Sequence, residues 1–125
     1  TLFSFTGCDN LYINSYKATM FVHGVNRHEC FAKFNKLDGT FVFRMKYRGP
    51  DDQIYYAADI EGGEVNIYYD SLGVKEKLFT AEAGYPIEGN TGFVDEGTVY
   101  IILEADNAKR GSIKIRLGGS GPFTN

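Results

Sequence analysis

Tyrosines accompanied by amide and carboxylate side chains are the residues of this sequence best suited to recognition chemistry. The flat apolar face of a tyrosine ring can stack on a sugar ring, while amide and carboxylate groups exchange hydrogen bonds with hydroxyls. The residues concerned are Tyr55, Tyr68, Asn66, Gln53 and Asp59. If the fold brings them onto one surface, they form a binding site for a glycan.

A hairpin centred on Gly62-Gly63 is predicted to bring these residues together. Two glycines supply the positive φ that a two-residue hairpin turn needs, so residues 53–60 are expected to pair with residues 64–70. The pairs expected on the inner face are Ile60 with Val65, Ala58 with Ile67 and Tyr56 with Tyr69. The residues expected on the outer face are Tyr55, Ala57, Asp59, Asn66, Tyr68 and Asp70. Alternatively, exposed tyrosines on such a face serve only to stabilise cross-strand pairs.

Acidic residues in three loops are candidate Ca²⁺ ligands, because hard cations bind carboxylate and carbonyl oxygens. The candidates are Asp51, Asp52, Asp95 and Glu96, with Asp106-Asn107 in the last hairpin. None of them forms an EF-hand pattern. The alternative is that aspartate and asparagine are simply the residues that turns favour.

The two cysteines, Cys8 and Cys30, are predicted to form a disulfide, which suggests an oxidising compartment. The alternative is a pair of free cysteines, as is also common in reduced cytosolic domains. Together with His23 and His28 they offer four ligands of the kind that Zn²⁺ accepts, but the spacing lacks a C-x₂-C pair, and no zinc site is predicted. A Cys30–His28 nucleophile pair is also not expected, because a nucleophile and its base normally meet from separate elements.

A basic stripe is predicted from Arg44, Lys46 and Arg48, which share one face of a strand. If the strand that carries Lys114 and Arg116 lies beside it, the stripe can hold an acidic polysaccharide or an acidic protein surface. A solvated outer face is the alternative interpretation.

The charge of the chain argues against nucleic acid and membrane partners. Sixteen acidic residues against 13 basic ones give a net charge of −3, without a block of like charge that could hold phosphates. No apolar run approaches the roughly 20 residues that a membrane-spanning helix needs.

All of these residues are expected to be held by β-strands or by the turns between them. The evidence for the strands is an alternation of apolar and polar residues, which is typical of half-buried strands. It is clearest at residues 40–48, where Phe41, Phe43, Met45 and Tyr47 share one side. The same period returns in 54–60, 65–69, 99–105 and 113–117, and weaker candidates are 2–6, 11–14, 19–23, 29–35 and 78–80. Between them lie turn sequences that contain Asp38-Gly39, Gly49-Pro50, Gly62-Gly63, Asp70 to Gly73, Gly89 to Gly92, Glu96-Gly97 and Lys109 to Gly111.

This pattern predicts an all-β fold, an antiparallel two-sheet β-sandwich of jelly-roll type with about eight strands. One domain is expected over residues 1–117, followed by a flexible tail or linker over 118–125, and only residues 74–82 offer an alternative helix.

The C-terminal half weakly resembles two families, on residues 64–73, 78–79, 97–102 and 111–117. One is the jelly-roll accessory module of the bacterial pre-peptidase C-terminal type, which is similar to carbohydrate-binding modules and implies polysaccharide or calcium binding. The other is the GOLD domain of cargo receptors, which the chain resembles also in Glu29-Cys30-Phe31 and in residues 97–107. That family has a second cysteine at the position of Ile102 in this sequence.

Taken together, the sequence predicts a non-catalytic, extracellular or cell-surface binding module for a polysaccharide or glycan, appended to a larger secreted protein. The alternative is a protein–protein interaction or structural module, such as an adhesin, cargo or assembly domain, that binds through its sheet edges.

Overall fold

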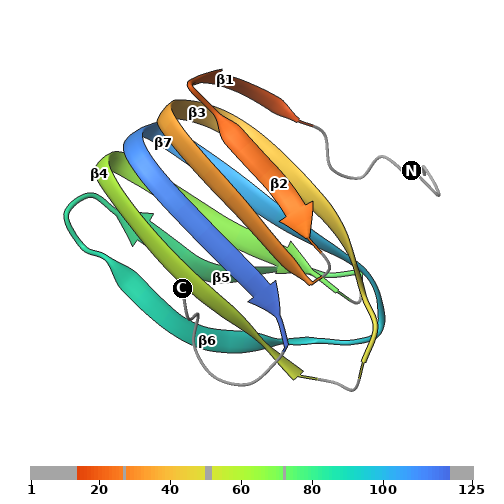
Figure 1. The fold of residues 1–125 in the computed structure, drawn as a ribbon. Coiled ribbons are helices and arrows are strands. Elements are labelled where there is room, and N and C mark those ends of the chain that lie inside the picture. The colour runs from red at the N-terminus through yellow and green to blue at the C-terminus, as the bar shows by residue number, and fades with distance from the viewer. Residues whose placement is uncertain (1–13, 27, 50–51, 72, 119–125) are drawn as a thin grey trace, which may run out of the picture.

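The structure, a computed structural model, describes residues 14–26, 28–49, 52–71 and 73–118 (Figure 1). These residues form antiparallel strands and contain no helix. The strands are β1 (Ser15–Thr19), β2 (Val22–Asn26), β3 (Glu29–Tyr47), β4 (Asp52–Asp70), β5 (Lys75–Glu82), β6 (Ile87–Val94) and β7 (Gly97–Leu117). The predicted all-β class is confirmed.

Three long strands, β3, β4 and β7, form the centre of the sheet and bend at the same level. β7 lies between β3 and β4 and pairs with both over nearly its whole length. The register shifts between Leu37 and Gly39 in β3 and between Gly62 and Glu64 in β4. In β7, Asn107 and Arg110 adopt positive φ at this level. A register shift of this kind is a β-bulge, an extra residue that bends the strand and increases its twist. Because the bulges lie beside one another in neighbouring strands, the sheet folds over along one line.

Folding over produces two layers that face each other (Figure 1). The front layer has the order β2-β3-β7-β4-β6, using residues 29–36 of β3, 110–117 of β7 and 52–61 of β4. The rear layer has the order β1-β3-β7-β4-β5, using the other halves of the long strands. The result is a sandwich in which three strands belong to both layers.

One hydrophobic core fills the space between the layers. The residues that the alternation predicted to point inward are buried, including Phe41, Phe43, Ile67 and Leu103. In β4 the inward positions are even-numbered up to Ile60 and odd-numbered from Val65 onward. This change of parity occurs at the bend, because one extra residue there turns every later side chain to the opposite face.

The hairpin predicted at Gly62-Gly63 is wrong. β4 continues through these glycines, and its two halves pair with β7 rather than with each other. The predicted pairs Ile60–Val65, Ala58–Ile67 and Tyr56–Tyr69 are absent; Ile60 pairs with Gly111 and Val65 with Ala105. Glycine permits a bend in a strand as readily as a hairpin turn, and here the long-range pairing decides between them.

Other predicted turns divide into connections and bends. Of the predicted turns, Gly49 follows β3, Ser71 and Gly73 follow β4, and Glu96 follows β6, so these turns fall at connections as predicted. The turns at 38–39 and 109–111 are instead bends within β3 and β7, and residues 89–92 lie within β6. The alternative helix at 74–82 is not formed, because residues 75–82 are the strand β5. The strand candidates at 2–6 and 11–14 fall, apart from Asn14, outside the described residues.

Cys30 is a free thiol on the inner face of β3 and is 1% exposed. The structure therefore does not contain the predicted Cys8–Cys30 disulfide; Cys8 itself lies outside the described residues. Burial, with a smaller effect from the Glu29 carboxylate, raises the pKa of the Cys30 thiol above its ordinary value. The buried sulfur is thus held in its protonated, unreactive form.

We predict that Cys30 resists a thiol reagent in the folded protein at pH 8 and reacts fully after denaturation. Peptide mapping after labelling distinguishes it from Cys8. Because the folded state keeps a proton that the unfolded state releases, stability is expected to fall as the pH rises above the ordinary thiol pKa. Rapid, complete labelling of Cys30 in the native protein contradicts this prediction.

Candidate functional site

The structure separates the predicted ligand-binding residues into two groups. Tyr55, Gln53 and Asp59 lie in the front half of β4, whereas Asn66 and Tyr68 lie in its rear half. Tyr55 pairs with Arg116, and Tyr68 pairs with Ile102 at the other end of β7. The single face that the hairpin predicted therefore does not exist, because the bend places the two tyrosines on opposite outer faces of the sandwich.

On the rear layer, Tyr68 and Asn66 are engaged by their neighbours. The Lys75 ammonium lies 4.5 Å from the centre of the Tyr68 ring, and its Nζ is 2.7 Å from a carboxylate oxygen of Glu104. The Asn66 side chain donates to Glu64 at 3.2 Å and accepts from the Thr80 hydroxyl at 2.8 Å. These contacts occupy the groups that a ligand would use, so the rear face is suited to structural support.

On the front layer, Tyr55 lies within a cluster of polar groups with fixed positions. The Arg116 guanidinium lies 5.1 Å from the centre of the Tyr55 ring, and Arg116 Nε donates to the Gly118 carbonyl at 3.0 Å. Asn90 of β6 pairs with Tyr55 of β4, and its side-chain amide donates a hydrogen bond to Gln53 Oε1. Tyr55 is half-buried and Gln53 and Asn90 are exposed, so this cluster can meet a ligand with little rearrangement.

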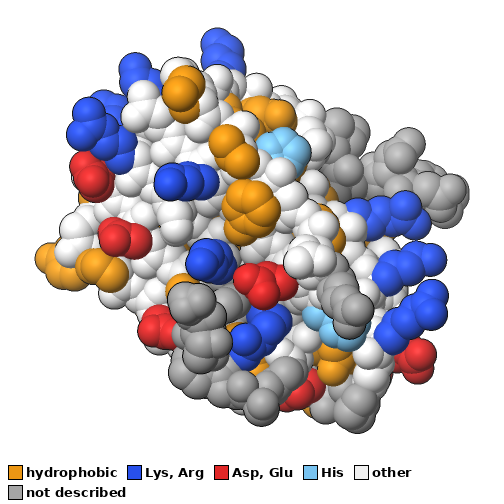
Figure 2. Space-filling model, viewed as in Figure 1, with side chains coloured by type: hydrophobic (Ala, Val, Ile, Leu, Met, Phe, Trp, Pro, Cys, Tyr) orange, Lys and Arg blue, Asp and Glu red, His pale blue; other side chains and the backbone are white. Residues whose placement is uncertain are grey.

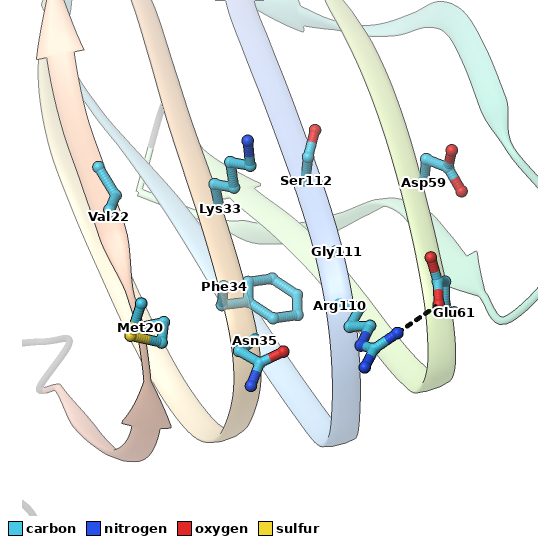
Figure 3. A pocket seen from close by; sticks show the side chains of 10 residues that line it. All are labelled: Met20, Val22, Lys33, Phe34, Asn35, Asp59, Glu61, Arg110, Gly111 and Ser112. Atoms are coloured by element: carbon cyan, nitrogen blue, oxygen red, sulfur yellow. Dashed lines mark ion pairs between the residues drawn. The ribbon is translucent and has the colours of Figure 1, made fainter.

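A groove of about 770 Å³ crosses the outer surface of the front layer next to the bend (Figure 3). Its floor comprises two rows of side chains from β3, β7 and β4, in the order of the strands. One row is Lys33, Ser112 and Asp59, and the next is Asn35, Arg110 and Glu61. The Arg110 guanidinium lies 3.8 Å from a Glu61 carboxylate oxygen. Met20 and Val22 provide an apolar wall at the β2 end.

A second hollow, of about 400 Å³, continues this groove toward β6. The two share Asp59 and Ser112, and the second adds Lys114 and Glu88. Next to it, the Phe31 side chain is 38% exposed. Its ring lies over Gly24, so close that a Cβ added at Gly24 would be 3.0 Å from a ring carbon. The front face therefore offers a continuous path across the strands, with polar groups interspersed among apolar ones.

The view of this face in Figure 2 shows the same mixture of side chains. Hydrophobic side chains lie in the middle of the face, with Lys, Arg, Asp and Glu side chains around them. Such a surface can contact both the hydroxyls and the C–H faces of a sugar.

Several residues of this surface were not predicted from the sequence, namely Phe31, Lys33, Asn35, Glu61, Arg110 and Ser112. The alternation shows that most of them point away from the core. Their meeting depends on the pairing of β3 and β4 with β7, which joins residues far apart in the chain. No local pattern contains that information.

The predicted basic stripe is also divided by the bend. Arg44 and Lys46 pair with Tyr100 and Thr98 in the rear layer, whereas Lys114 and Arg116 lie in the front layer. The strands β3 and β7 are neighbours, as the stripe required, but Arg44 and Lys46 pair with the N-terminal half of β7, whereas Lys114 and Arg116 belong to its C-terminal half. Arg44, Lys46 and Arg48 are exposed, but they do not join Lys114 and Arg116 in one stripe.

For metal binding, the described residues contain no group of three His, Cys, Asp or Glu side chains that could hold an ion. Of the predicted calcium ligands, Asp51 lies outside the described residues. Asp52 accepts from the Gln53 backbone at 2.7 Å, and Asp95 accepts from the Glu96 backbone at 3.2 Å. Glu96 is exposed. Calcium binding stays a prediction.

Among the residues that the structure describes, no helix is long and apolar enough to span a membrane.

Comparison with known proteins shows similarity only in structure. No family model and no curated protein matches the sequence. Similar solved structures include a ruminal GH26 endo-β-1,4-mannanase, with a TM-score of 0.45 and 11% identity over 71% of this chain and 20% of that one. They also include a CBM4 carbohydrate-binding module, with a TM-score of 0.43 and 13% identity over 86% and 78% of the two chains. A CBM29 module complexed with mannohexaose has a TM-score of 0.42 and 15% identity over 89% and 81%.

The chain spans only a fifth of the mannanase. The other similar structures include Drosophila melanogaster CENP-C bound to CAL1, with a TM-score of 0.39 and 15% identity over 88% and 84% of the two chains. The weak resemblance to jelly-roll carbohydrate-binding modules is thus found among solved structures as well, at identities of 13% and 15%.

Proposed function

We propose that this chain is a non-catalytic module that binds a glycan across the front face. The observation that carries the proposal is the groove of about 770 Å³ and its continuation of about 400 Å³, which share Asp59 and Ser112. Both volumes fall in the range of ligand-binding clefts.

The chemistry of this path matches a sugar chain. Hydroxyl groups require donors and acceptors, which Lys33, Ser112, Asn35 and Asp59 provide along the groove. Sugar rings also present C–H surfaces that pack on aromatic and aliphatic groups, and the exposed Phe31 of β3, which pairs with Lys114, supplies one on this face.

The dimensions favour an oligosaccharide over a single sugar. The face extends from β2 to β6, which are separated by four inter-strand spacings. At about 4.8 Å per spacing, the path across the strands is roughly 19 Å long. Tyr55 and its polar cluster lie on the same face, one row beyond Ala57 and Lys114, and we include them in the proposed site.

We extend the proposal to a module within a larger protein, since residues 118–122, Gly-Gly-Ser-Gly-Pro, have the composition of a linker. A setting outside the cytoplasm is part of the same proposal and rests on the proposed glycan ligand alone.

A second candidate function is protein binding along the β2 edge. Val22 and Val25 on this strand are 59% and 48% exposed, and β3 is the only strand that pairs with β2 among the described residues. An edge with exposed apolar side chains can accept a strand from another protein.

Replacing Tyr55 with alanine is expected to weaken glycan binding about tenfold, corresponding to ~1.4 kcal/mol, because the ring is lost from the face and Arg116 loses the ring that it lies over. Tyr68→Ala is the matched control, since it removes the same side chain from the opposite layer. Isothermal titration calorimetry on ligands found with a glycan array measures both variants, and tyrosine fluorescence provides a second signal.

Equal losses in the two tyrosine variants, or unchanged binding by Tyr55→Ala and Asp59→Asn alike, exclude the front face as the site. If no glycan binds and a protein partner is lost after Val22→Lys, the second candidate function holds instead.

A further inference from the structure

The end of the sandwich at which the long strands bend carries an unusual pair of cations. Lys36 of β3 and Lys109 of β7 are directly opposite each other in the register, and both are exposed. Like charges opposite each other on neighbouring strands destabilise a sheet. Neither lysine forms an ion pair with any residue that the structure describes.

These two lysines line two adjoining hollows. One, of about 340 Å³, also includes Asn35, Glu61 and Arg110. The other, of about 390 Å³, extends over the bend to Lys17. Cationic side chains gather at this end of the molecule, at the upper left of Figure 2, where Figure 1 shows β3, β7 and β4 bending.

The first of these hollows is continuous with the groove on the front face. Asn35, Glu61 and Arg110 line both of them. Arg110 has only a long contact of 3.8 Å with Glu61, and both side chains are about two-thirds exposed. A chain lying in the groove therefore reaches the lysine pair through Arg110.

Two carboxylates, Glu61 and Asp38, line these hollows together with the lysines. Glu61 lies 3.8 Å from the Arg110 guanidinium, and Asp38 accepts a hydrogen bond from the Asn107 backbone at 3.0 Å. Asp59 lies on β4 and is separated from Lys33 of β3 by the intervening strand β7. The cations on β3 and β7 thus form one side of the path, although the chain as a whole has a net charge of −3.

We propose that the preferred glycan is acidic, and that Lys36, Lys109 and Arg110 bind its carboxylate or sulfate groups at the bend. This inference rests on the proposed function and adds the ligand class. An anionic group between Lys36 and Lys109 would attract both ammonium groups and relieve their mutual repulsion. It is therefore expected to bind more tightly than an anion that contacts one lysine alone. Carboxylate and sulfate share this chemistry, and the experiment distinguishes them.

The experiment measures the affinity of the full chain for polygalacturonate, chondroitin sulfate and a neutral galactomannan, by affinity electrophoresis and calorimetry. The variant Lys36→Gln/Lys109→Gln is expected to bind the acidic polysaccharides at least tenfold more weakly and the neutral one unchanged. The matched control is Lys46→Gln/Lys77→Gln, which also changes the net charge from −3 to −5. Its lysines are exposed in the rear layer, and it is expected to resemble the wild type.

Folding is not expected to obscure the result, because removing two like charges should leave the melting temperature unchanged or raised. If the double variant melts lower, Lys36→Gln alone provides the same comparison. Affinity for the acidic polysaccharide should also fall as sodium chloride is raised from 50 to 500 mM.

Equal affinity for neutral and acidic polysaccharides, or equal losses in the two double variants, overturns the inference and leaves the proposed function standing. Absence of binding to every glycan overturns both. Tighter binding of double-stranded DNA or phosphatidylglycerol vesicles through the same lysines overturns the assignment of the ligand class.

Discussion

Replacing Gly63 with alanine is expected to destabilise the protein by about 3 kcal/mol or more, the sum of a left-handed backbone for a non-glycine residue and a steric overlap. Gly63 has a φ of 70° and lies at the bend of β4. A Cβ there would be 2.2 Å from the Asn107 carbonyl oxygen and 2.5 Å from that of Asp106. Both are backbone atoms of β7, so no side-chain rotation relieves the overlap.

Gly84→Ala is the control for this variant. Gly84 has a similar φ of 79°, but nothing lies within 4 Å of the Cβ that alanine would add. This control is expected to show only the conformational cost, about 1–2 kcal/mol. Urea denaturation measures both. A Gly63→Ala variant as stable as Gly84→Ala would mean that the bends of β4 and β7 are not packed as closely as the structure has them.

Replacing Leu103 with alanine is expected to cost about 2–5 kcal/mol, the range for a fully buried leucine that leaves a cavity. Leu103 is 0% exposed on β7 and lies between Phe41 of β3 and Ile67 of β4 in the register. Neighbours on both strands restrict the collapse that would reduce the cavity. Thermal and urea unfolding provide the measurement.

Val74→Ala, at a position that is 60% exposed, is the comparison for Leu103→Ala and should change stability by less than about 0.5 kcal/mol. A loss at Leu103 no greater than this would show that the inner face of β7 is not enclosed by a second layer. The alternation from which the sandwich was predicted would then lack its physical basis.

The sequence was sufficient to predict which side chains are buried, and insufficient to predict which strands meet. The period-two pattern identified the inward residues of residues 40–48, 54–60, 65–69, 99–105 and 113–117, because alternation reflects burial directly. It also showed the change of parity between Ile60 and Val65. A tight turn and a bend in a continuous strand both produce that change, so the local pattern could not distinguish them.

The same ambiguity made the predicted arrangement of the binding site wrong. Once Gly62-Gly63 was interpreted as a turn, Tyr55 and Tyr68 were expected to be neighbours, although the continuous strand separates them. The groove depends on Lys33, Ser112 and Asp59 meeting in one row across three strands. Each of these residues is unremarkable in its own segment, and only the long-range register brings them together.

The central position of β7 has a consequence for how the chain can be made. β3 and β4 do not pair with each other over their length; β7 joins them in both layers. During synthesis on the ribosome, the first 96 residues therefore emerge without the strand that completes either half of the core. Folding has to wait for residues 97–117, and contacts this distant in sequence form slowly. Until then the long strands expose unpaired edges, and this interval is when a chaperone would protect the nascent chain from aggregation.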